Sequence, residues 1–187
     1  MSCVIPSGET KIDEIHEAAR AYLQRGWSVI PIEPHGKRPI IKWTTYQSRT
    51  PTMHEIDGWF AKADNFNIAI VTGKLSGIVV LDIDPSHQGA VSLQSWENQH
   101  SPLPTTFEVR TGGGGRHLYF KHPGTRTPNR ANLAAGIDLR GDGGCVVAPP
   151  SLHRSGHHYQ WLKGHSPQEM TLAAMPDWLA AMVKRKR

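Results

Sequence analysis

One segment of the chain reads Ile78-Val79-Val80-Leu81-Asp82-Ile83-Asp84-Pro85 and is typical of a β-strand that ends in two acids. Its first four residues are apolar and mostly β-branched, which favours a strand, and the proline then ends it. Side chains alternate between the faces of a strand, so Asp82 and Asp84 share a face, about 7 Å apart along the chain, while Ile83 points into a core. Paired carboxylates repel each other unless a cation lies between them, and Mg²⁺ or Mn²⁺ suits such oxygens. The alternative is an exposed strand end with two solvated acids, followed by a turn over residues 84–87.

The composition is that of an ordinary soluble protein. With 187 residues, 38% hydrophobic and 20% charged, the chain is long enough for one α/β domain or for two small lobes that share a core. No apolar run reaches the roughly 20 residues that span a bilayer, and we expect neither a secretory signal nor membrane contact. Cys3 and Cys145 are too few for a disulfide framework or a cysteine-based zinc site, which is consistent with a cytoplasmic protein.

The charge balance favours a polyanionic partner. The formal net charge is +5, and 11 histidines can add to it at lower pH. Such a balance is common among proteins that bind nucleic acids or nucleotides. Part of the excess lies in the terminal residues Lys184-Arg185-Lys186-Arg187, which form either a solvated tail or the start of a linker.

Hydrophobic periodicity predicts an α+β protein. We expect helices over residues 10–25, from Thr52 (a capping box with Glu55), over 90–99 and from Pro176. We expect strands over 27–31, 68–72, 78–84, 107–111, 116–120, 136–140 and 145–148, a basic loop over 121–132, and a hairpin joining 151–154 to 157–161. The strands cluster in the second half, which favours α+β over a repeated βαβ array.

Three of the predicted strands carry polar residues on one face. These are Asp82 and Asp84 on the first, His117 on the second, and Asp138 with Arg140 on the third. If the strands are neighbours, these groups converge, and such a set can hold two divalent ions about 3.5–4 Å apart for phosphoryl transfer. His117 then suits hydrogen bonding to a phosphate oxygen better than it suits Mg²⁺. The alternative for a single strand histidine is a surface or structural role.

Four glycines, Gly112 to Gly115, precede the strand that carries His117. Glycines allow positive φ and let backbone N–H groups approach an anion, so this turn is a candidate phosphate cradle beside Arg116. Its alternative is a flexible hairpin turn. The pattern is neither a Walker A loop nor a dinucleotide fingerprint, because Gly-Lys-Ser/Thr is missing and a strand follows.

The ordered motifs resemble those of a known superfamily. They are Asp82-Ile83-Asp84, then Thr111-Gly-Gly-Gly-Gly-Arg-His117-Leu-Tyr-Phe120, then Gly136-Ile-Asp138-Leu-Arg140-Gly-Asp-Gly-Gly144, and finally Ala148-Pro-Pro-Ser151. Together they are similar to the archaeo-eukaryotic primase superfamily, above all its bifunctional primase–polymerase (Prim-Pol) branch. Members of that branch lie N-terminal to helicases in plasmid, phage and integrated-element replication proteins. The likeness extends from about Ala18 to Trp161.

The resemblance implies a two-lobed fold. A leader (1–9) would precede an N-terminal α/β lobe (10–76) and an RRM-like lobe (77–175) with a mixed or antiparallel sheet that carries the active site. A C-terminal helix and basic tail (176–187) would lead towards a helicase region or partner.

The resemblance also implies metal-dependent nucleotidyl transfer. The substrates would be dNTPs or NTPs, a single-stranded DNA template and a primer 3′-hydroxyl, with synthesis of the primer itself as a further activity. By motif, Asp82, Asp84 and Asp138 would bind Mg²⁺ or Mn²⁺, and His117 would contact the triphosphate. Charge and placement add further expected phosphate or sugar contacts, which are Lys37, Gly114, Gly115, Arg116, Arg140 and Ser151.

Two departures from the family pattern bear on the site. Many relatives have a serine two residues before the motif histidine, and here that residue is Gly115. Some relatives carry a zinc-binding insertion, which the cysteines here cannot build, so no zinc is expected. The histidines at 153, 157, 158 and 165 suggest either a zinc cluster or surface residues, and the lack of thiolates favours the surface.

Other functions remain open from the residues. The same carboxylates suit a metal-dependent nuclease or phosphodiesterase, and the fold also suits a non-catalytic module that binds single-stranded DNA or loads a helicase. Trp43 and Tyr46, near several cations, either stack on template bases or cap a core.

Overall fold

The structure is a computed structural model that describes residues 9–61 and 65–184, with side chains from residue 14 onward. Residues 1–8 of the expected leader (1–9) and the last three basic residues of the tail therefore lie outside the described residues, whereas Glu9 begins the first helix. The elements in chain order are α1 (Glu9–Gln24), β1 (Val29–Ile32), α2 (Met53–Phe60), β2 (Asn67–Val71), β3 (Ile78–Ile83), α3 (Gly89–Gln99), β4 (Glu108–Arg110), β5 (Arg116–Lys121), β6 (Arg130–Ala134), β7 (Ile137–Arg140), β8 (Cys145–Val147), β9 (Gln160–Trp161) and α4 (Asp177–Lys184). Short 3₁₀ turns, η1 (Thr44–Gln47) and η2 (Pro85–His87), lie between them.

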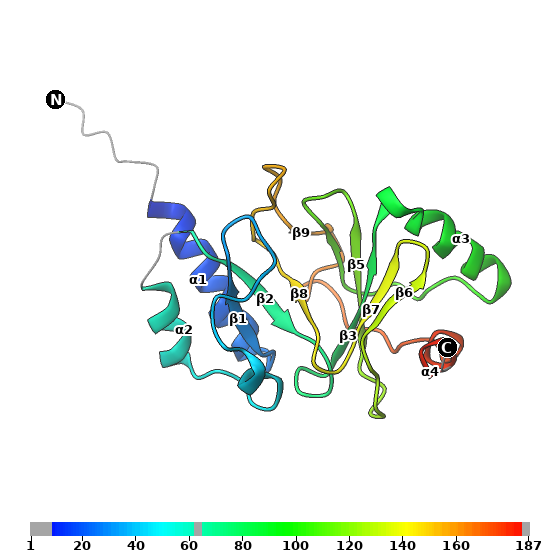
Figure 1. The fold of residues 1–187 in the computed structure, drawn as a ribbon, viewed down its shortest axis with the longest axis horizontal. Coiled ribbons are helices and arrows are strands. Elements are labelled where there is room, and N and C mark those ends of the chain that lie inside the picture. The colour runs from blue at the N-terminus through cyan, green and yellow to red at the C-terminus, as the bar shows by residue number, and fades with distance from the viewer. Residues whose placement is uncertain (1–8, 62–64, 185–187) are drawn as a thin grey trace.

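The described strands form two sheets, and each strand pairs antiparallel with its neighbours, which confirms the α+β prediction. The larger sheet has the order β6-β7-β3-β5-β4-β9, and the smaller has the order β1-β2-β8. Figure 1 shows the small sheet beside α1 and α2, and the large sheet beside α3 and α4. The four helices of the described chain lie where periodicity predicts them.

The central strand β3 is apolar because both of its faces are covered. Val79, Leu81 and Ile83 pack with α3 and α4 in one core, whereas Val80 packs in the other core. The side chains of the neighbouring strands alternate in the same way, and Leu118 of β5 and Leu139 of β7 lie in the core beneath α3 and α4. The opposite face of β3, β5 and β7 carries the polar residues Asp82, His117 and Asp138 at one end of the sheet.

The other core lies between the small sheet and the polar-bearing face of the large sheet. Its centre is aromatic, because Trp27 stacks on Tyr119 and lies edge-on to Phe107, with Trp161 and Tyr22 around them. Large rings contribute much of the apolar area that a core of this size buries.

Tyr46 and Trp43 belong to this core rather than to an exposed stacking surface. Tyr46 is buried, its ring lies edge-on to Trp59, and its hydroxyl donates to Glu55. Trp43 packs partly buried against the same cluster.

The boundary expected at residue 76 does not separate the two sheets. β8 lies in the range assigned to the second lobe, yet it pairs with β2 and completes the small sheet. Ser151 and Tyr159 are likewise buried near the small sheet. The pattern of a short apolar strand does not reveal which sheet it joins, and this is why the sequence misassigned β8.

One further expectation needs correction and another needs an addition. The basic segment 121–132 is not all loop, because β6 begins at Arg130 and forms an edge of the large sheet. β6 is short and partly exposed, so it lacks the apolar alternation that signals a strand. The predicted hairpin that joins 151–154 to 157–161 is present, since the His153 N–H donates to His157 O, the Tyr159 N–H donates to Ser151 O and Leu152 bridges His158, but its last residues, β9, pair in addition with β4.

Within the described ranges, none of the helices is both long and apolar enough to cross a lipid bilayer.

Candidate active site

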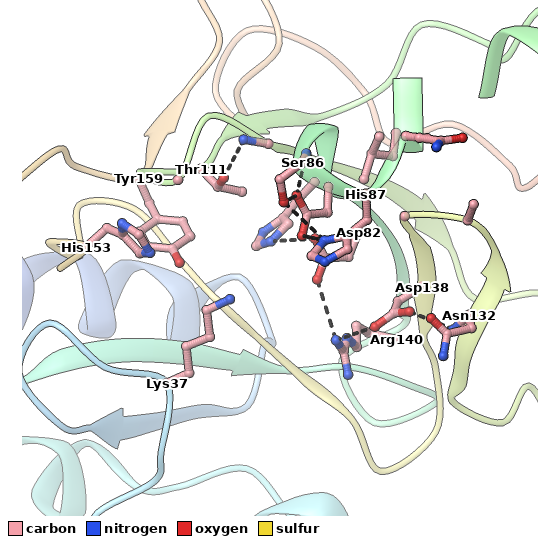
Figure 2. Close-up of a pocket in the computed structure, with 18 of the residues that line it drawn as sticks. Lys37, Asp82, Ser86, His87, Thr111, Asn132, Asp138, Arg140, His153 and Tyr159 are labelled. Atoms are coloured by element: carbon pink, nitrogen blue, oxygen red, sulfur yellow. Dashed lines mark hydrogen bonds and ion pairs between the residues drawn. The ribbon is translucent and has the colours of Figure 1, made fainter. Parts of the chain in front are cut away.

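A cavity of about 830 Å³ opens at the polar end of the large sheet, on the side that faces the small sheet. Its lining residues come from the loop after β1, from β3, β5, β6 and β7, from the turns at 84–88, 111–115 and 135–136, and from the segment 153–159 (Figure 2). A volume of this size is typical of small-molecule sites.

The register of three strands brings the predicted site residues together. Asp82 on β3 lies directly opposite His117 on β5 and opposite Asp138 on β7. All three line the cavity, together with Asp84 and Arg140. The prediction that these strands are neighbours with their polar residues on one face is therefore confirmed.

Arg140 links two of the acids. Its Nη2 lies 2.8 Å from Asp138 Oδ2 and 3.5 Å from Asp82 Oδ2. The other Asp138 oxygen accepts the Asn132 backbone N–H at 2.8 Å. Arg140 was expected to contact a phosphate, and in this structure its charge is instead balanced by these two carboxylates.

Asp84 caps the turn η2. Its Oδ1 accepts the Ser86 N–H at 2.9 Å and the Ser86 hydroxyl at 2.6 Å, and its Oδ2 lies 2.8 Å from His87 Nδ1. These contacts, with the Ser86 hydroxyl first, hold the pKa of the Asp84 carboxyl below its ordinary value. The carboxylate is therefore ionised at neutral pH.

Two glycines, Gly89 and Gly136, hold the backbone in place at Asp84. The Asp84 N–H donates to Gly136 O at 2.8 Å, and the Gly89 N–H donates to Asp84 O at 2.9 Å. A Cβ on Gly136 would lie 2.5 Å from Gly89 N and 2.6 Å from Asp84 O, so glycine is required at this close approach. The backbone at Asp84 is thereby tied to the start of β7.

His117 is a buried, neutral imidazole. Burial is the main cause that lowers its pKa to about 4, against a smaller opposing effect of Asp82. Its Nε2 lies 3.5 Å from Asp82 Oδ1, and its buried Nδ1 has no hydrogen-bond partner among the described residues. A buried polar atom without a partner is uncommon, which marks this ring as a candidate for contact with a ligand.

Two residues expected at the site lie away from the cavity. Arg116 alternates with His117 along β5, so its side chain leaves the cavity face and pairs with both oxygens of Glu108 at 2.6 and 3.0 Å. Ser151 is fully buried beside β2, where its hydroxyl accepts the Ile68 N–H at 3.0 Å and donates to Ile68 O at 3.1 Å. These contacts correct the expectation that either residue faces a nucleotide.

The tetraglycine turn is more ordered than a flexible hairpin loop. The Gly114 N–H donates to Thr111 O at 3.0 Å, and the Gly115 N–H donates to Thr111 Oγ1 at 2.8 Å. The two amides expected to bind an anion are thus already used within the turn. Gly113 and Gly115 line the cavity and Gly114 does not, which corrects the expected contact at Gly114.

Steric contacts explain why residue 115 is a glycine. A Cβ there would lie 2.6 Å from the carbonyl oxygen of Ile83 and 3.1 Å from Thr111 Oγ1. A serine, which many relatives carry at this point, would require the end of β3 to shift.

The donor chemistry of the cavity suits a divalent cation, although the side chains do not form a ready metal cage. In residues 14–61 and 65–184, no group of three or more His, Cys, Asp or Glu side chains is arranged to hold a metal ion. Asp82 and Asp138 nevertheless face one cationic nitrogen, so both carboxylates are turned towards a common positive charge. Hard carboxylate oxygens of this kind are the preferred ligands of Mg²⁺ and Mn²⁺.

The histidines considered as a zinc cluster have separate surroundings. His158 Nδ1 contacts Pro150 O at 2.7 Å, and His165 Nδ1 contacts Thr106 O at 3.1 Å. His153 and His157 both contact the Ser155 hydroxyl.

Several residues of the cavity wall were not predicted as site residues, among them Tyr159, Arg154 and Asn132. Tyr159 is 3% exposed, and its ring packs against His117 and His153 at centroid distances of 5.9 and 6.1 Å. Arg154 and Tyr159 follow the Ala148–Ser151 motif closely in sequence, and that proximity was the only signal that pointed to them.

The family model Prim-Pol, the N-terminal domain of bifunctional DNA primase/polymerases, matches residues 19–178. All the cavity-lining residues lie inside this range. No curated protein sequence matches the chain.

Proposed function

The chain belongs to the Prim-Pol family of bifunctional DNA primase/polymerase N-terminal domains, and on this premise we propose that it transfers nucleotides from nucleoside triphosphates to a template-directed 3′-hydroxyl. In this reaction the 3′-hydroxyl releases its proton to solvent, and its oxygen forms a bond to the α-phosphorus. The bond from the α-phosphorus to the bridging oxygen breaks, and pyrophosphate leaves. The reaction requires a single-stranded DNA template and a primer end, and priming without a primer is part of the same proposal.

One observation carries the proposal, namely that Asp82 and Asp138, on adjacent strands, face the same Arg140 nitrogen at 3.5 and 2.8 Å. Two carboxylates that converge on a cation fit the metal-binding acids of phosphoryl transfer. We assign Mg²⁺ or Mn²⁺ binding to Asp82 and Asp138, with Asp84 as the third acid. When bound, divalent cations at these acids neutralise charge on the phosphates and favour ionisation of the attacking hydroxyl.

The remaining side chains would position the substrate. A neutral His117 donates one hydrogen bond to a phosphate oxygen and carries no charge that would repel the metals. Arg140, once released from the two acids, is free to pair with a phosphate.

The two-lobed architecture is part of the same proposal. The small sheet with α1 and α2 would be the N-terminal lobe, extended by β8, and the large sheet would be the catalytic lobe. The cavity draws Lys37 from the first and the acids from the second. A helicase domain or partner, as the family likeness implies, would act on the template beside it.

The test is primer extension on a primed template with dNTPs and Mn²⁺. Asp82→Asn and Asp138→Asn keep the shape of the side chain, and each should reduce extension by at least about 100-fold, because each removes a charge that the metals require. Glu14→Gln, an exposed acid on α1, is the control and should leave extension unchanged.

Two outcomes would replace the proposal. Shortening of the primer in the absence of dNTPs would indicate a nuclease. Unchanged DNA affinity in all variants, with no reaction in the unmodified protein, would indicate a binding module.

A further inference from the structure

The edge strand β6 is irregular directly beside Asp138. Its pairing with β7 shifts register between Arg130 and Ala134, and over this stretch β6 has three residues, 131–133, where β7 has only Asp138. These three residues form a bulge, here called the β6 bulge. Asn132 in its centre has a φ of 51°, a left-handed conformation that asparagine tolerates better than most residues with a side chain. Bulges of this kind occur often at sheet edges and next to active sites, where they redirect chemical groups.

The β6 bulge turns a backbone N–H towards a side chain. In a regular antiparallel ladder the N–H groups lie in the plane of the sheet, whereas the side chains stand roughly perpendicular to it. An N–H of a regular edge strand therefore points away from the carboxylate of the residue opposite. The left-handed Asn132 instead donates its N–H to Asp138 Oδ1 at 2.8 Å (Figure 2).

Each oxygen of Asp138 thus has its own donor. Oδ2 pairs with Arg140 Nη2 at 2.8 Å, and the same nitrogen lies 3.5 Å from Asp82 Oδ2. Because the Asn132 N–H holds Oδ1, the carboxylate group cannot rotate freely, and Oδ2 stays turned towards Asp82. The bond from the bulge therefore selects which oxygen of Asp138 faces the other acid.

The β6 bulge is fixed on both sides by bonds from helices. At its start, Arg130 Nε donates to Val183 O of α4 at 3.2 Å. Beyond its end, the Ser92 hydroxyl of α3 donates to Ala135 O at 2.7 Å. The direction of the bulge N–H is therefore set by the packing of the large sheet against α3 and α4.

We propose that Asn132 is a positioning residue for Asp138, and that its left-handed backbone, rather than its amide side chain, performs this role. The inference rests on the proposed function, because it names the group that orients one of the acids assigned to Mg²⁺ or Mn²⁺. Partners that orient the ligands of a metal change metal affinity or activity by about 10–100-fold when they are removed. Glycine can adopt the conformation of Asn132 without strain, whereas a β-branched residue cannot.

Two substitutions separate the backbone from the side chain. Asn132→Gly keeps the left-handed conformation and its N–H, whereas Asn132→Val disfavours both. Mn²⁺ alone is titrated into the metal-free protein, and the free ion is followed by electron paramagnetic resonance. Asn132→Val should weaken Mn²⁺ binding about tenfold, and Asn132→Gly should stay within about twofold of the unmodified chain. Equal weakening in both variants, no weakening in either, or no Mn²⁺ binding by the unmodified chain would overturn the proposal.

His35→Val is the matched control for strain. His35 also has a positive φ, of 57°, and it lies exposed outside the cavity lining. This substitution should lower the melting temperature and leave the Mn²⁺ affinity unchanged, because it strains the backbone far from Asp138.

A double-mutant cycle tests whether Asn132 acts through Asp138. In an Asp138→Asn background, Asn132→Val should weaken Mn²⁺ binding no further, because the carboxylate that it positions is already gone. A loss that adds to that of Asp138→Asn would contradict the assignment.

Amide hydrogen exchange measures the bond without any metal. The Asn132 N–H should exchange slowly although it lies on an edge strand, and Asp138→Ala should speed its exchange at least about tenfold by removing the acceptor. An Asn132 amide that exchanges as fast as an unbonded amide in the unmodified chain would overturn the proposal.

The two proposals can fail separately. In primer extension, Asn132→Val should lower kcat about tenfold and leave the KM for dNTP nearly unchanged, because it acts on the acids that serve the chemical step. If the exchange and Mn²⁺ results hold but the unmodified chain extends no primer, the positioning role stands without the polymerase activity. If extension is present and Asn132→Val matches the unmodified chain in kcat and in Mn²⁺ affinity, the polymerase function stands and the positioning role is wrong.

Discussion

Arg140 supplies the positive charge that the facing carboxylates of Asp82 and Asp138 need, with its Nη2 3.5 and 2.8 Å from them. Its side chain is 37% exposed, so solvent screens the pairing and the arginine is held only weakly. In the proposed reaction, Arg140 leaves this position and its charge moves to a phosphate. The same arginine therefore offsets the repulsion between these two facing acids.

Ser151 lies in a motif that the family likeness connects with the nucleotide, yet its contacts are structural. Ser151→Ala removes a hydroxyl that is bonded to both the N–H and the carbonyl of Ile68 in a fully buried place. We expect a loss of about 1–3 kcal/mol in the free energy of unfolding, measured by urea titration, because the buried Ile68 N–H loses its partner, whereas the Ile68 carbonyl still accepts the Ala148 N–H. The dATP affinity of the folded variant should not change.

The exposed Ser95→Ala on α3 is the control for this substitution and should leave the free energy of unfolding unchanged. A loss of nucleotide affinity in Ser151→Ala without a loss of stability would restore the contact that the sequence suggested.

At the scale of elements, alternation in β3, β5 and β7 was enough to predict which residues share a face. It assigned Asp82, His117 and Asp138 to the polar side, because a strand buried on its other side must alternate. Alternation carries no information about partners, so the pairing of β8 with β2 and of β9 with β4 could not be predicted. The cavity wall at Arg154 depends on such long-range docking, and for that reason the sequence did not reveal it.

The capping box of α2 predicts an acid-dependent contribution to stability. Glu55 accepts from Arg49 at 2.6 and 2.8 Å, from the Thr52 N–H at 2.8 Å and from the Tyr46 hydroxyl at 2.9 Å. These bonds, with the Arg49 bond first, hold the pKa of Glu55 far below its ordinary value. A lowered pKa in the folded state stabilises the protein above the unfolded pKa of about 4.3, and this contribution is lost as the pH falls towards the folded pKa.

Glu55→Gln should accordingly cost about 1 kcal/mol at pH 7, because a neutral amide caps the helix and pairs with Arg49 less well. The difference from the unmodified chain should shrink at pH 3. Urea titrations at the two pH values measure both differences, and a constant difference would show that the Glu55 charge is not the cause.

At the scale of the whole molecule, the chain passes between the two sheets more than once, and this path links them. The chain builds β1 and β2 of the small sheet, then β3 to β7 of the large one, returns for β8, and ends the large sheet with β9. Tyr22 on α1 joins both parts, since its hydroxyl donates to Pro149 O at 2.9 Å and accepts the Trp161 Nε1–H at 3.0 Å. The aromatic core is therefore shared by the two sheets, and neither sheet is completed by a continuous piece of sequence.

This path predicts that the described chain unfolds as one unit. Urea transitions followed by tryptophan fluorescence and by far-UV circular dichroism should coincide, because Trp27 and Trp161 report on a core that both sheets line. A fragment of residues 1–76 should show no cooperative transition, since β2 loses β8 along one edge and Trp27 loses its stacking on Tyr119. Coincident transitions would mean that Lys37 and the acids, which line the same cavity, are held in place by a single core. Two separate transitions, or a folded fragment with dispersed NMR signals, would instead mean that Lys37 and Asp82 belong to independent units, and the spacing between them would then be set by a hinge.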